Sequence, residues 1–170
     1  MIRRKVHPNG LKKVTDIIVN TTKFREANAT DRNALEEMIL AYYLFDHQAI
    51  DKTKINSALD MALKKNPHIV IWIIEVNEEI AGYLAVAIGF TIEAGGKDGF
   101  LDELFLKEKY RNQGIGRKAV QFAIGICPTL GIRRLSLEVE SHNLRAKRLY
   151  QDIGFFTHDR ILMSHWTDQD

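Results

Sequence analysis

The sequence predicts one α+β (mixed α/β) domain, in which about four helices flank a mostly antiparallel central sheet. Three observations predict this class. Two segments with helical spacing come early, three β-rich runs then follow one another without a helix between them, and the order after residue 106 is helix, strand, helix. A doubly wound parallel sheet would alternate strands and helices throughout. With 170 residues, the chain has enough length for a single hydrophobic core.

The expected elements are identified from the spacing of their apolar residues and from the turn signals between them. In chain order they are a strand at 22–27, a helix that ends near 46, a helix at 53–65, strands at 69–76, 80–90 and 100–106, a helix from 115, a strand at 135–140, a helix from Ser141 or Asn143 to Ile153, and closing strands from Phe155 onward.

The helices are predicted from apolar residues that recur three or four positions apart. Thr30 or Asp31 is the expected N-cap of the first helix, because a short side-chain oxygen can accept from its first free amides. The pair at 66–67, Asn-Pro, should stop the second helix, and Pro128 predicts an early end or a kink in the third. Gly154 stands where the last helix should end.

The strands are predicted from runs of β-branched and aromatic residues. Residues 80–90 are nearly all apolar, so we expect both faces of that strand to be covered. Residues 135–140 alternate strictly between apolar and polar side chains. The pair Asn77-Glu78 predicts a hairpin turn, and the glycines within 93–99 predict another.

Composition is that of an ordinary soluble globular protein, with 45% hydrophobic and 27% charged residues. The net charge of +2 is too small to indicate binding to nucleic acid or to a membrane surface. The single cysteine, Cys127, excludes an internal disulfide and favours a reducing compartment. No apolar stretch has membrane-spanning length and residues 1–11 lack the apolar core of a signal peptide, so we expect a cytoplasmic protein.

Residues 1–21 read as a basic N-terminal extension, and residues 22–170 as the single domain. A run of like charges usually faces water, so a solvated arm is the expected form of the extension. An extra strand or a contact in a homodimer stays open as an alternative. A nucleic-acid-binding arm is a third alternative, and it predicts salt-sensitive binding that residues 1–20 would carry.

The most informative segment is Arg111–Lys118, a basic loop with two glycines between an apolar strand and the start of a helix. Glycines let the backbone approach a ligand closely, and the first amides of a helix have no internal partners. This arrangement is typical of a phosphate-binding loop. Gly114, Gly116 and Ala119 also fit the dinucleotide fingerprint, but the polar connector before the loop disfavours that interpretation.

Two blocks of residues together resemble the GNAT superfamily of acyl-coenzyme A-dependent N-acyltransferases. The first is Arg111-x-x-Gly114-x-Gly116, which matches the pyrophosphate signature of the family. The second block, at its expected spacing, consists of Asn143, Ala146, Leu149-Tyr150 and Gly154-Phe155. The resemblance covers residues 22–166.

The resemblance implies acetyl-CoA as cosubstrate and a splayed pair of strands, those of Glu103 and Leu137, with the pantetheine arm between them. It assigns cofactor contacts to the end of the first strand, to the loop and to the second block. These residues are Leu104, Phe105, Leu106, Arg111, Asn112, Gln113, Gly114, Ile115, Gly116, Arg117, Lys118 and Asn143. The six histidines show no metal-ligand spacing and there is no paired cysteine, so no metal is expected.

Catalysis of acyl transfer to an amine needs a base, because the amine must be neutral to attack. At pH 7 deprotonation of a lysine-like amine costs about 4–5 kcal/mol. Glu103 is the candidate, since the family often places its base on this strand. An unreactive, salt-bridged acid is the alternative. Asp102 would point to the opposite strand face, unless a β-bulge brings both acids to one cavity, where Asp102 would bind the acceptor.

The leaving thiolate needs a proton, and Tyr150 occupies the position of the usual general acid of the family. A core tyrosine is the alternative, and packing of the ring is compatible with a hydroxyl in the cleft. Tyr42, Tyr43, Phe45 and Asp46 end the first helix, where the family binds its acceptor. Phe45 and Asp46 are therefore candidate acceptor contacts, with core packing as the equal alternative.

The acceptor is expected to be a cationic primary amine, on a small molecule or a peptide. Glu93, Asp98, Asp102 and Glu103 would gather on its side and attract it. The acidic pair before three apolar residues is similar to diamine and polyamine acetyltransferases. An acyl-CoA-sensing regulatory domain without turnover is the alternative function, and the presence of both Glu103 and Tyr150 argues against it.

Overall fold

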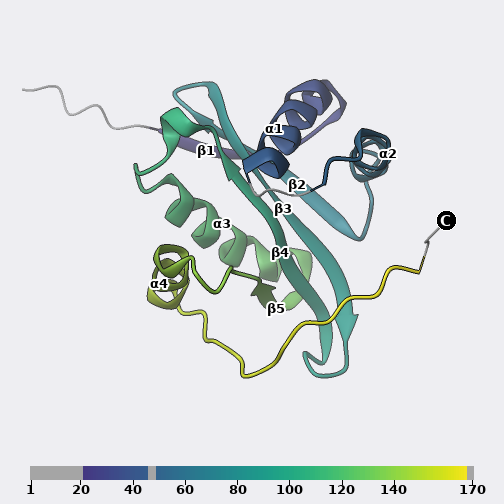
Figure 1. The fold of residues 1–170 in the computed structure, drawn as a ribbon, viewed down its shortest axis with the longest axis vertical. Helices are drawn as coiled ribbons and strands as arrows, with labels where there is room; N and C mark the ends of the chain where they lie inside the picture. The colour runs from purple at the N-terminus through teal and green to yellow at the C-terminus, as the bar shows by residue number, and fades with distance from the viewer. Residues whose placement is uncertain (1–20, 46–48, 168–170) are drawn as a thin grey trace, which may run out of the picture.

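The structure is a computed structural model that describes residues 21–45 and 49–167. Its elements form one five-stranded sheet with helices on both faces (Figure 1). In chain order they are β1 (Thr22–Glu26), the short 3-10 helix η1 (Ala29–Asp31), α1 (Arg32–Phe45), α2 (Lys52–Ala62), β2 (Ile69–Val76), β3 (Glu79–Thr91), β4 (Gly96–Leu106), the 3-10 helix η2 (Glu108–Tyr110), α3 (Ile115–Leu130), β5 (Ile132–Leu137) and α4 (Leu144–Ile153). The predicted fold class is confirmed.

The sheet follows chain order, β1-β2-β3-β4-β5, and only its last pair is parallel. The β4–β5 ladder runs from Lys97 opposite Ile132 to Leu101 opposite Leu137. There β5 ends, whereas β4 continues to Leu106 alongside β3. The predicted splay between these two strands is therefore present, and it begins just before Asp102.

Two apolar cores lie on the two faces of the sheet. Helices α1 and α2 cover one face, where Leu35 and Leu59 pack near Tyr83 and Phe105. Helix α3 covers the other face through a core that includes Val120, and α4 packs beside α3 (Figure 1). The middle of β3 is buried on both faces, as its continuous apolar sequence predicts.

Helix starts differ from the predicted caps. Asn28, rather than Thr30 or Asp31, caps the first helical turn, and its side chain accepts from the Thr30 amide at 2.9 Å. Asp31 closes a capping box by accepting from the Asn28 amide, and it forms a two-pronged ion pair with Arg25 at 2.7 and 2.8 Å. Its carboxylate is therefore committed to β1.

Helix ends also differ from the predictions. Helix α2 is capped by Asp51 and ends at Ala62, before the predicted Lys65, which has a left-handed φ of 55°. Helix α3 passes through Pro128 to Leu130, so the predicted early end was wrong. A proline so near the C-terminus removes one backbone bond, and the buried face around Ala123 and Cys127 holds the last turns in place.

The C-terminal segment does not form the predicted closing strands within residues 155–167. It runs as an irregular chain from α4 across the β3–β4 hairpin (Figure 1), where Arg160 contacts Glu93 at 3.3 Å. Phe155 packs against the core, but the large apolar side chains after it are exposed, including Ile161 and Met163. An apolar sequence without a ladder partner is therefore not enough to make a strand here.

One predicted turn is confirmed, and two strand limits differ from the predictions. The hairpin at Asn77-Glu78 is confirmed, and both residues have positive φ angles. Strand β4 begins at Gly96, so the second turn is shorter than the predicted 93–99. Strand β5 occupies 132–137 rather than 135–140, because it pairs where α3 ends.

Among the described helices, none is long and apolar enough to cross a membrane.

Replacing Gly82 with alanine should destabilise the fold. A Cβ there would lie 2.1 Å from the Phe105 carbonyl oxygen, where β3 meets the end of β4. Relief of that clash must separate the strands, so we expect a loss of about 2 kcal/mol or more in the free energy of unfolding. Chemical denaturation of the two proteins measures it.

The matched control is Gly125→Ala, in the middle of α3, where an added Cβ meets no atom within 4 Å. Alanine favours a helix over glycine by about 0.5–1 kcal/mol, so this variant should be at least as stable as the wild type. Equal stability of the Gly82 variant and the wild type would refute the close packing at β3–β4.

Candidate active site

The loop at 111–118 presents free backbone amides at the start of α3. Asn112 and Gly114 both adopt left-handed angles, with φ of 63° and 77°. Gly114 is the N-cap residue and supplies no side chain, so no cap bonds the first amides of the 16-residue helix. A Cβ on Gly114 would meet nothing within 4 Å, which shows that the loop is open outward. Open amides with the positive helix end can bind phosphate.

Other side chains of the loop hold it against the protein. Gln113 donates to the Lys109 carbonyl at 2.7 Å. Arg117 pairs with Asp152 of α4 at 3.0 Å, and Lys118 lies 3.4 Å from the Thr22 hydroxyl. Ile115 is buried under the helix start. The anion-binding capacity of the loop therefore rests mainly on its backbone amides.

Arg111 points away from the amides, toward the α1 face. Its Nε donates to the Leu106 carbonyl at 2.8 Å. Its guanidinium lies over the rings of Phe45 and Phe105, at 4.6 and 5.5 Å from their centroids. The arginine thus joins the loop to the end of β4 and places a cation beside the exposed Phe45.

The end of β4 has one edge without a strand partner in the described chain. Beyond Leu101, β5 no longer pairs with it, while β3 still pairs with its other edge as far as Leu106. Phe105 is buried on the α1 face, and Leu104 and Leu106 pack toward the α3 core. Backbone groups along this edge are available to an extended, amide-containing ligand arm.

A β-bulge lies at Asp102. Ala85 pairs with Glu103, whereas the next residue of β3, Val86, pairs with Leu101, so Asp102 has no opposite residue. Leu101 and Leu104, on either side of the two acids, both pack toward the α3 core, so Asp102 and Glu103 both lie on the α1 face of the strand. The bulge considered from the sequence is therefore present.

Glu103 lies in a partly buried pocket of tyrosines. The Tyr83 hydroxyl donates to its Oε2 at 2.7 Å, and the Tyr43 hydroxyl also interacts with the carboxylate. Burial raises the pKa of Glu103, and the charge of Asp102 adds to this, while the two phenols act in the opposite direction. Asp102 itself is exposed, although partial desolvation raises the pKa of its carboxyl.

Tyr150 lies on the other side of the sheet from Glu103. It belongs to α4, packs edge-to-face on Phe155 with centroids 5.9 Å apart, and lines a cavity of about 570 Å³ that also reaches Leu137. Burial raises the pKa of its hydroxyl, so it stays protonated at neutral pH. Leu137 is also the last residue of β5 that pairs with β4, so this cavity lies next to the point where the two strands separate.

The remaining predicted contacts have distinct places. Asn143 caps α4, and its side-chain oxygen accepts from the Ala146 amide at 3.0 Å. Phe45 is exposed at the end of α1, whereas Asp46 lies outside the described residues. Among the residues described, no group of three or more metal-ligating side chains is arranged to hold an ion.

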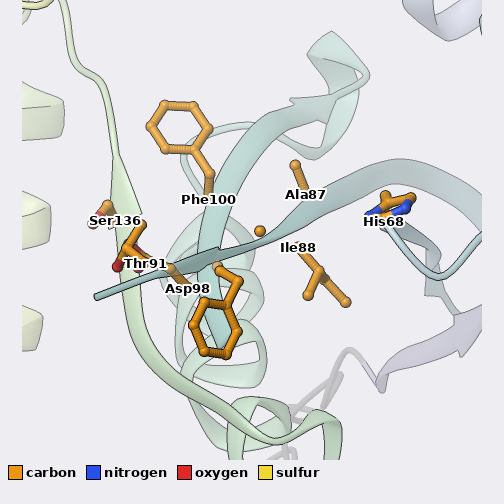
Figure 2. Close-up of a pocket in the computed structure, with 10 residues that line it drawn as sticks. His68, Ala87, Ile88, Thr91, Asp98, Phe100 and Ser136 are labelled. Carbon is orange, nitrogen blue, oxygen red and sulfur yellow. The ribbon is translucent and has the colours of Figure 1, made fainter. Parts of the chain in front are cut away.

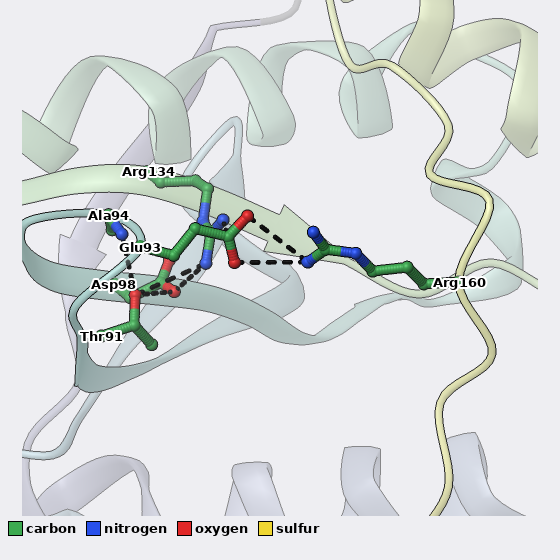
Figure 3. Close-up of polar contacts among 6 residues, drawn as sticks. All are labelled: Thr91, Glu93, Ala94, Asp98, Arg134 and Arg160. Carbon is green, nitrogen blue, oxygen red and sulfur yellow. Dashed lines mark hydrogen bonds and ion pairs between the residues drawn. The ribbon is translucent and has the colours of Figure 1, made fainter.

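The predicted gathering of four acids was wrong. Glu93 and Asp98 lie at the far end of the β3–β4 hairpin, where Arg134 and Arg160 neutralise them (Figure 3). Arg134 holds Asp98 at 3.1 and 2.5 Å and lowers the pKa of that carboxyl. Glu93 in the turn and Asp98 near the start of β4 lie at one end of the hairpin, whereas Asp102 and Glu103 lie toward the other end of β4.

A second hollow of about 500 Å³ lies on the outer part of the same hairpin (Figure 2). It contains a histidine and a serine, but His68 and Ser136 lie at opposite ends of its lining (Figure 2). Most of the other lining residues are apolar or glycine. No nucleophile–base pair is therefore formed there.

Sequence reasoning missed Tyr83. It is the one phenol within the apolar run of β3, and a wholly buried hydroxyl needs a hydrogen-bond partner. That requirement could have marked it as a neighbour of a polar group. Its partner depends on the register of β3 against β4, which the sequence does not reveal.

Comparisons with known proteins agree with this geometry. A family model described as the acetyltransferase (GNAT) family matches residues 32–155. The chain is 29% identical to the uncharacterized N-acetyltransferase YycN of Bacillus subtilis (strain 168) over 148 residues, or 85% of this chain and 93% of that protein.

Two solved structures share the fold. The integron cassette protein HFX_CASS3, from the mobile metagenome of Cole Harbour Salt Marsh, has a TM-score of 0.75 and 27% identity, over 86% of this chain and 91% of that one. A predicted acetyltransferase of Clostridium acetobutylicum, solved with acetyl-CoA, has a TM-score of 0.71 and 17% identity, over 85% and 96% of the two chains.

The family model spans most of the chain, from the start of α1 to the second residue after α4, and includes the bulged strand and the glycine loop. This protein therefore belongs to the acetyltransferase (GNAT) family and is an N-acetyltransferase.

Proposed function

We propose that the protein transfers an acetyl group from acetyl-CoA to a primary amine of a cationic acceptor, by direct attack in a ternary complex. In this proposal Glu103 accepts the proton of the amine and Tyr150 protonates the leaving sulfur. The observation that carries it is the partly buried Glu103 at a β-bulge, beside the open edge of β4. Perturbed acids in such places are candidates for catalysis.

The residues present fit acetyl-CoA in two respects. The uncapped start of α3 offers amides to a diphosphate, and the open edge of β4 offers peptide groups to the amide-rich pantetheine arm. Loop residues Asn112 to Lys118 would hold the diphosphate, and Leu104 to Leu106 the arm. Arg111 would brace the loop against β4, and Asn143 would border the arm.

The charge on the α1 face favours a cationic acceptor. Neither Asp102 nor Glu103 forms a salt bridge with a cation among the described residues, unlike Glu93 and Asp98. Two carboxylates without ion-pair partners create a negative potential that attracts an ammonium group. Phe45 and Asp46 would border this entrance, which suits either a small amine or a side chain of a peptide.

Glu103 has the properties that the first proton transfer requires. An ammonium group cannot attack, and its deprotonation at neutral pH costs about 4–5 kcal/mol for a lysine-like amine. Burial raises the pKa of Glu103, which brings it closer to the pH at which it works and makes it a stronger base. Asp102 lies next to it and would orient the amine.

Tyr150 would complete the exchange at the other end of the reaction. Acetyl-CoA supplies the acetyl group as a thioester, and the sulfur departs as the carbon–nitrogen bond forms. The Tyr150 hydroxyl stays protonated because burial raises its pKa, and it lines the cavity next to the splay. It would therefore give its proton to that sulfur.

Glu103→Gln tests the base. Wild-type kcat/KM should rise with pH as Glu103 loses its proton, at a pH above the ordinary range of a glutamate because burial raises its pKa. The glutamine variant should lose about 10²-fold or more in turnover, and its profile should move to higher pH, where the amine itself deprotonates. Release of free thiol across a pH series measures both.

Glu93→Gln is the control, because Glu93 is an acid at the far hairpin. Its pH profile should match that of the wild type. A Glu103 variant whose profile does not move would exclude Glu103 as the base.

Tyr150→Phe tests the acid. The ring and its contact with Phe155 remain, so the fold and the affinity for coenzyme A should change little. Without the hydroxyl we expect kcat to fall by about 10²-fold. Steady-state rates and calorimetric titration with coenzyme A measure the two effects, and a variant with normal kcat would rule out this role.

Gly114→Ala tests the loop. Alanine tolerates a φ of 77° poorly, at a cost of about 1–2 kcal/mol, so the amides should lose their arrangement. We expect affinity for coenzyme A to fall about tenfold, while Gly125→Ala in the same helix binds normally. Titration of both variants with coenzyme A measures this, and equal affinities would place the diphosphate elsewhere.

A further inference from the structure

Two tyrosines hold the carboxylate of Glu103 from different elements. Tyr83 comes from β3 and donates to Oε2 at 2.7 Å, and Tyr43 comes from α1. The register explains the reach of Tyr83. Ala85 lies directly opposite Glu103, and its small side chain leaves room for the phenol two positions away to cross diagonally.

The side chain of Tyr83 is held in place by its burial. Its residue is 0% exposed and packs among the apolar side chains under α1 and α2. Burial, followed by the charge of Glu103, raises the pKa of its hydroxyl far above the usual range, so it remains a donor at every physiological pH. A rigid donor bonded to the Glu103 carboxylate restricts the orientation of that side chain.

We propose that Tyr83 is a positioning residue, which fixes the Glu103 carboxylate in its working orientation and favours its ionised form, with Tyr43 acting from the opposite element. This inference rests on the proposed role of Glu103 as the base. A carboxylate has about four lone-pair sites, so two phenols leave room to accept a proton from the amine.

The groups around the Glu103 carboxylate determine whether loss of a phenol raises or lowers its pKa. Asp102 on β4 opposes ionisation, Tyr83 and Tyr43 favour it, and burial is the largest cause against it. Tyr42 lies beside this group, with its ring centroid 6.3 Å from that of Phe105, and Arg111, stacked on the same ring, is a cation on this face. Removing a phenol therefore removes support for the charged form and should raise the pKa of Glu103.

The test is Tyr83→Phe, which keeps the ring and deletes the hydroxyl. We expect the acid limb of kcat/KM to move upward by about one pH unit, since bonds to a charged group are worth about that much. NMR titration of carbon-13-labelled glutamate carboxyls in the full chain should show the same upward shift for Glu103, without reference to activity.

Tyr110→Phe is the matched control. Tyr110 is a buried phenol that donates to a different carboxylate, Glu79 Oε2, at 2.6 Å. That variant loses the same kind of bond and should keep the wild-type pH midpoint. A shift common to both variants would indicate a general effect of lost stability and would overturn the inference.

The remaining outcomes separate this inference from the proposed function. If Glu103→Gln changes the pH profile of kcat/KM and Tyr83→Phe does not, the role of Tyr83 is overturned and that of Glu103 as the base stands. If neither variant changes the pH profile, Glu103 is excluded as the base. The NMR titration then decides whether Tyr83 controls the pKa of the Glu103 carboxyl. If the Tyr83 variant does not fold, the pH profile and the NMR titration are measured on Tyr43→Phe, which lies at a less buried position.

Discussion

The strand β4 carries two irregularities within two residues, and the site depends on both. Its pairing with β5 ends at Leu101, and its register against β3 shifts at Asp102. The first leaves an open edge of peptide groups beside the start of α3. The second turns an extra acid toward α1. A regular strand with two complete ladders would have no unpaired backbone to offer and would send Asp102 and Glu103 to opposite faces.

Much of the fold was predictable, because its signals are local. Helical periodicity and β-rich runs located the strands and α-helices from β1 to α4 to within a few residues, and the glycines at 114 and 154 marked the helix ends at which the backbone turns left-handed. The failures have non-local causes. Asn28 caps the first turn, whereas Asp31, one of the two candidates from the sequence, pairs with Arg25 on β1 and accepts from the Asn28 amide. The apolar C-terminal segment forms no strand in its described part because strand formation requires a partner edge.

The candidate site also has a part that local sequence predicts and a part that depends on strand register. The loop and the positions of Glu103 and Tyr150 follow from local sequence, but the surroundings of each acid follow from the register. The sequence alone cannot show that Asp98 faces Arg134 of the neighbouring strand or that Tyr83 reaches Glu103. Both are cross-strand contacts between residues far apart in the chain, and they decide which acids have a cationic partner and which have a phenol.

One strand therefore holds two carboxylates with opposite fates. Asp98 has an arginine partner, which lowers its pKa and makes it a weak base fixed in a structural role. Glu103 has phenols as partners, and burial still raises its pKa above the usual value. A phenol orients a carboxylate through a directed bond without bringing a full positive charge. An arginine in place of Tyr83 would orient Glu103 as well, but it would suppress the basicity that the transfer of a proton requires, and it would repel a cationic acceptor. Phenol partners therefore orient Glu103 while leaving it much of the basicity that burial provides, which is what its proposed role requires.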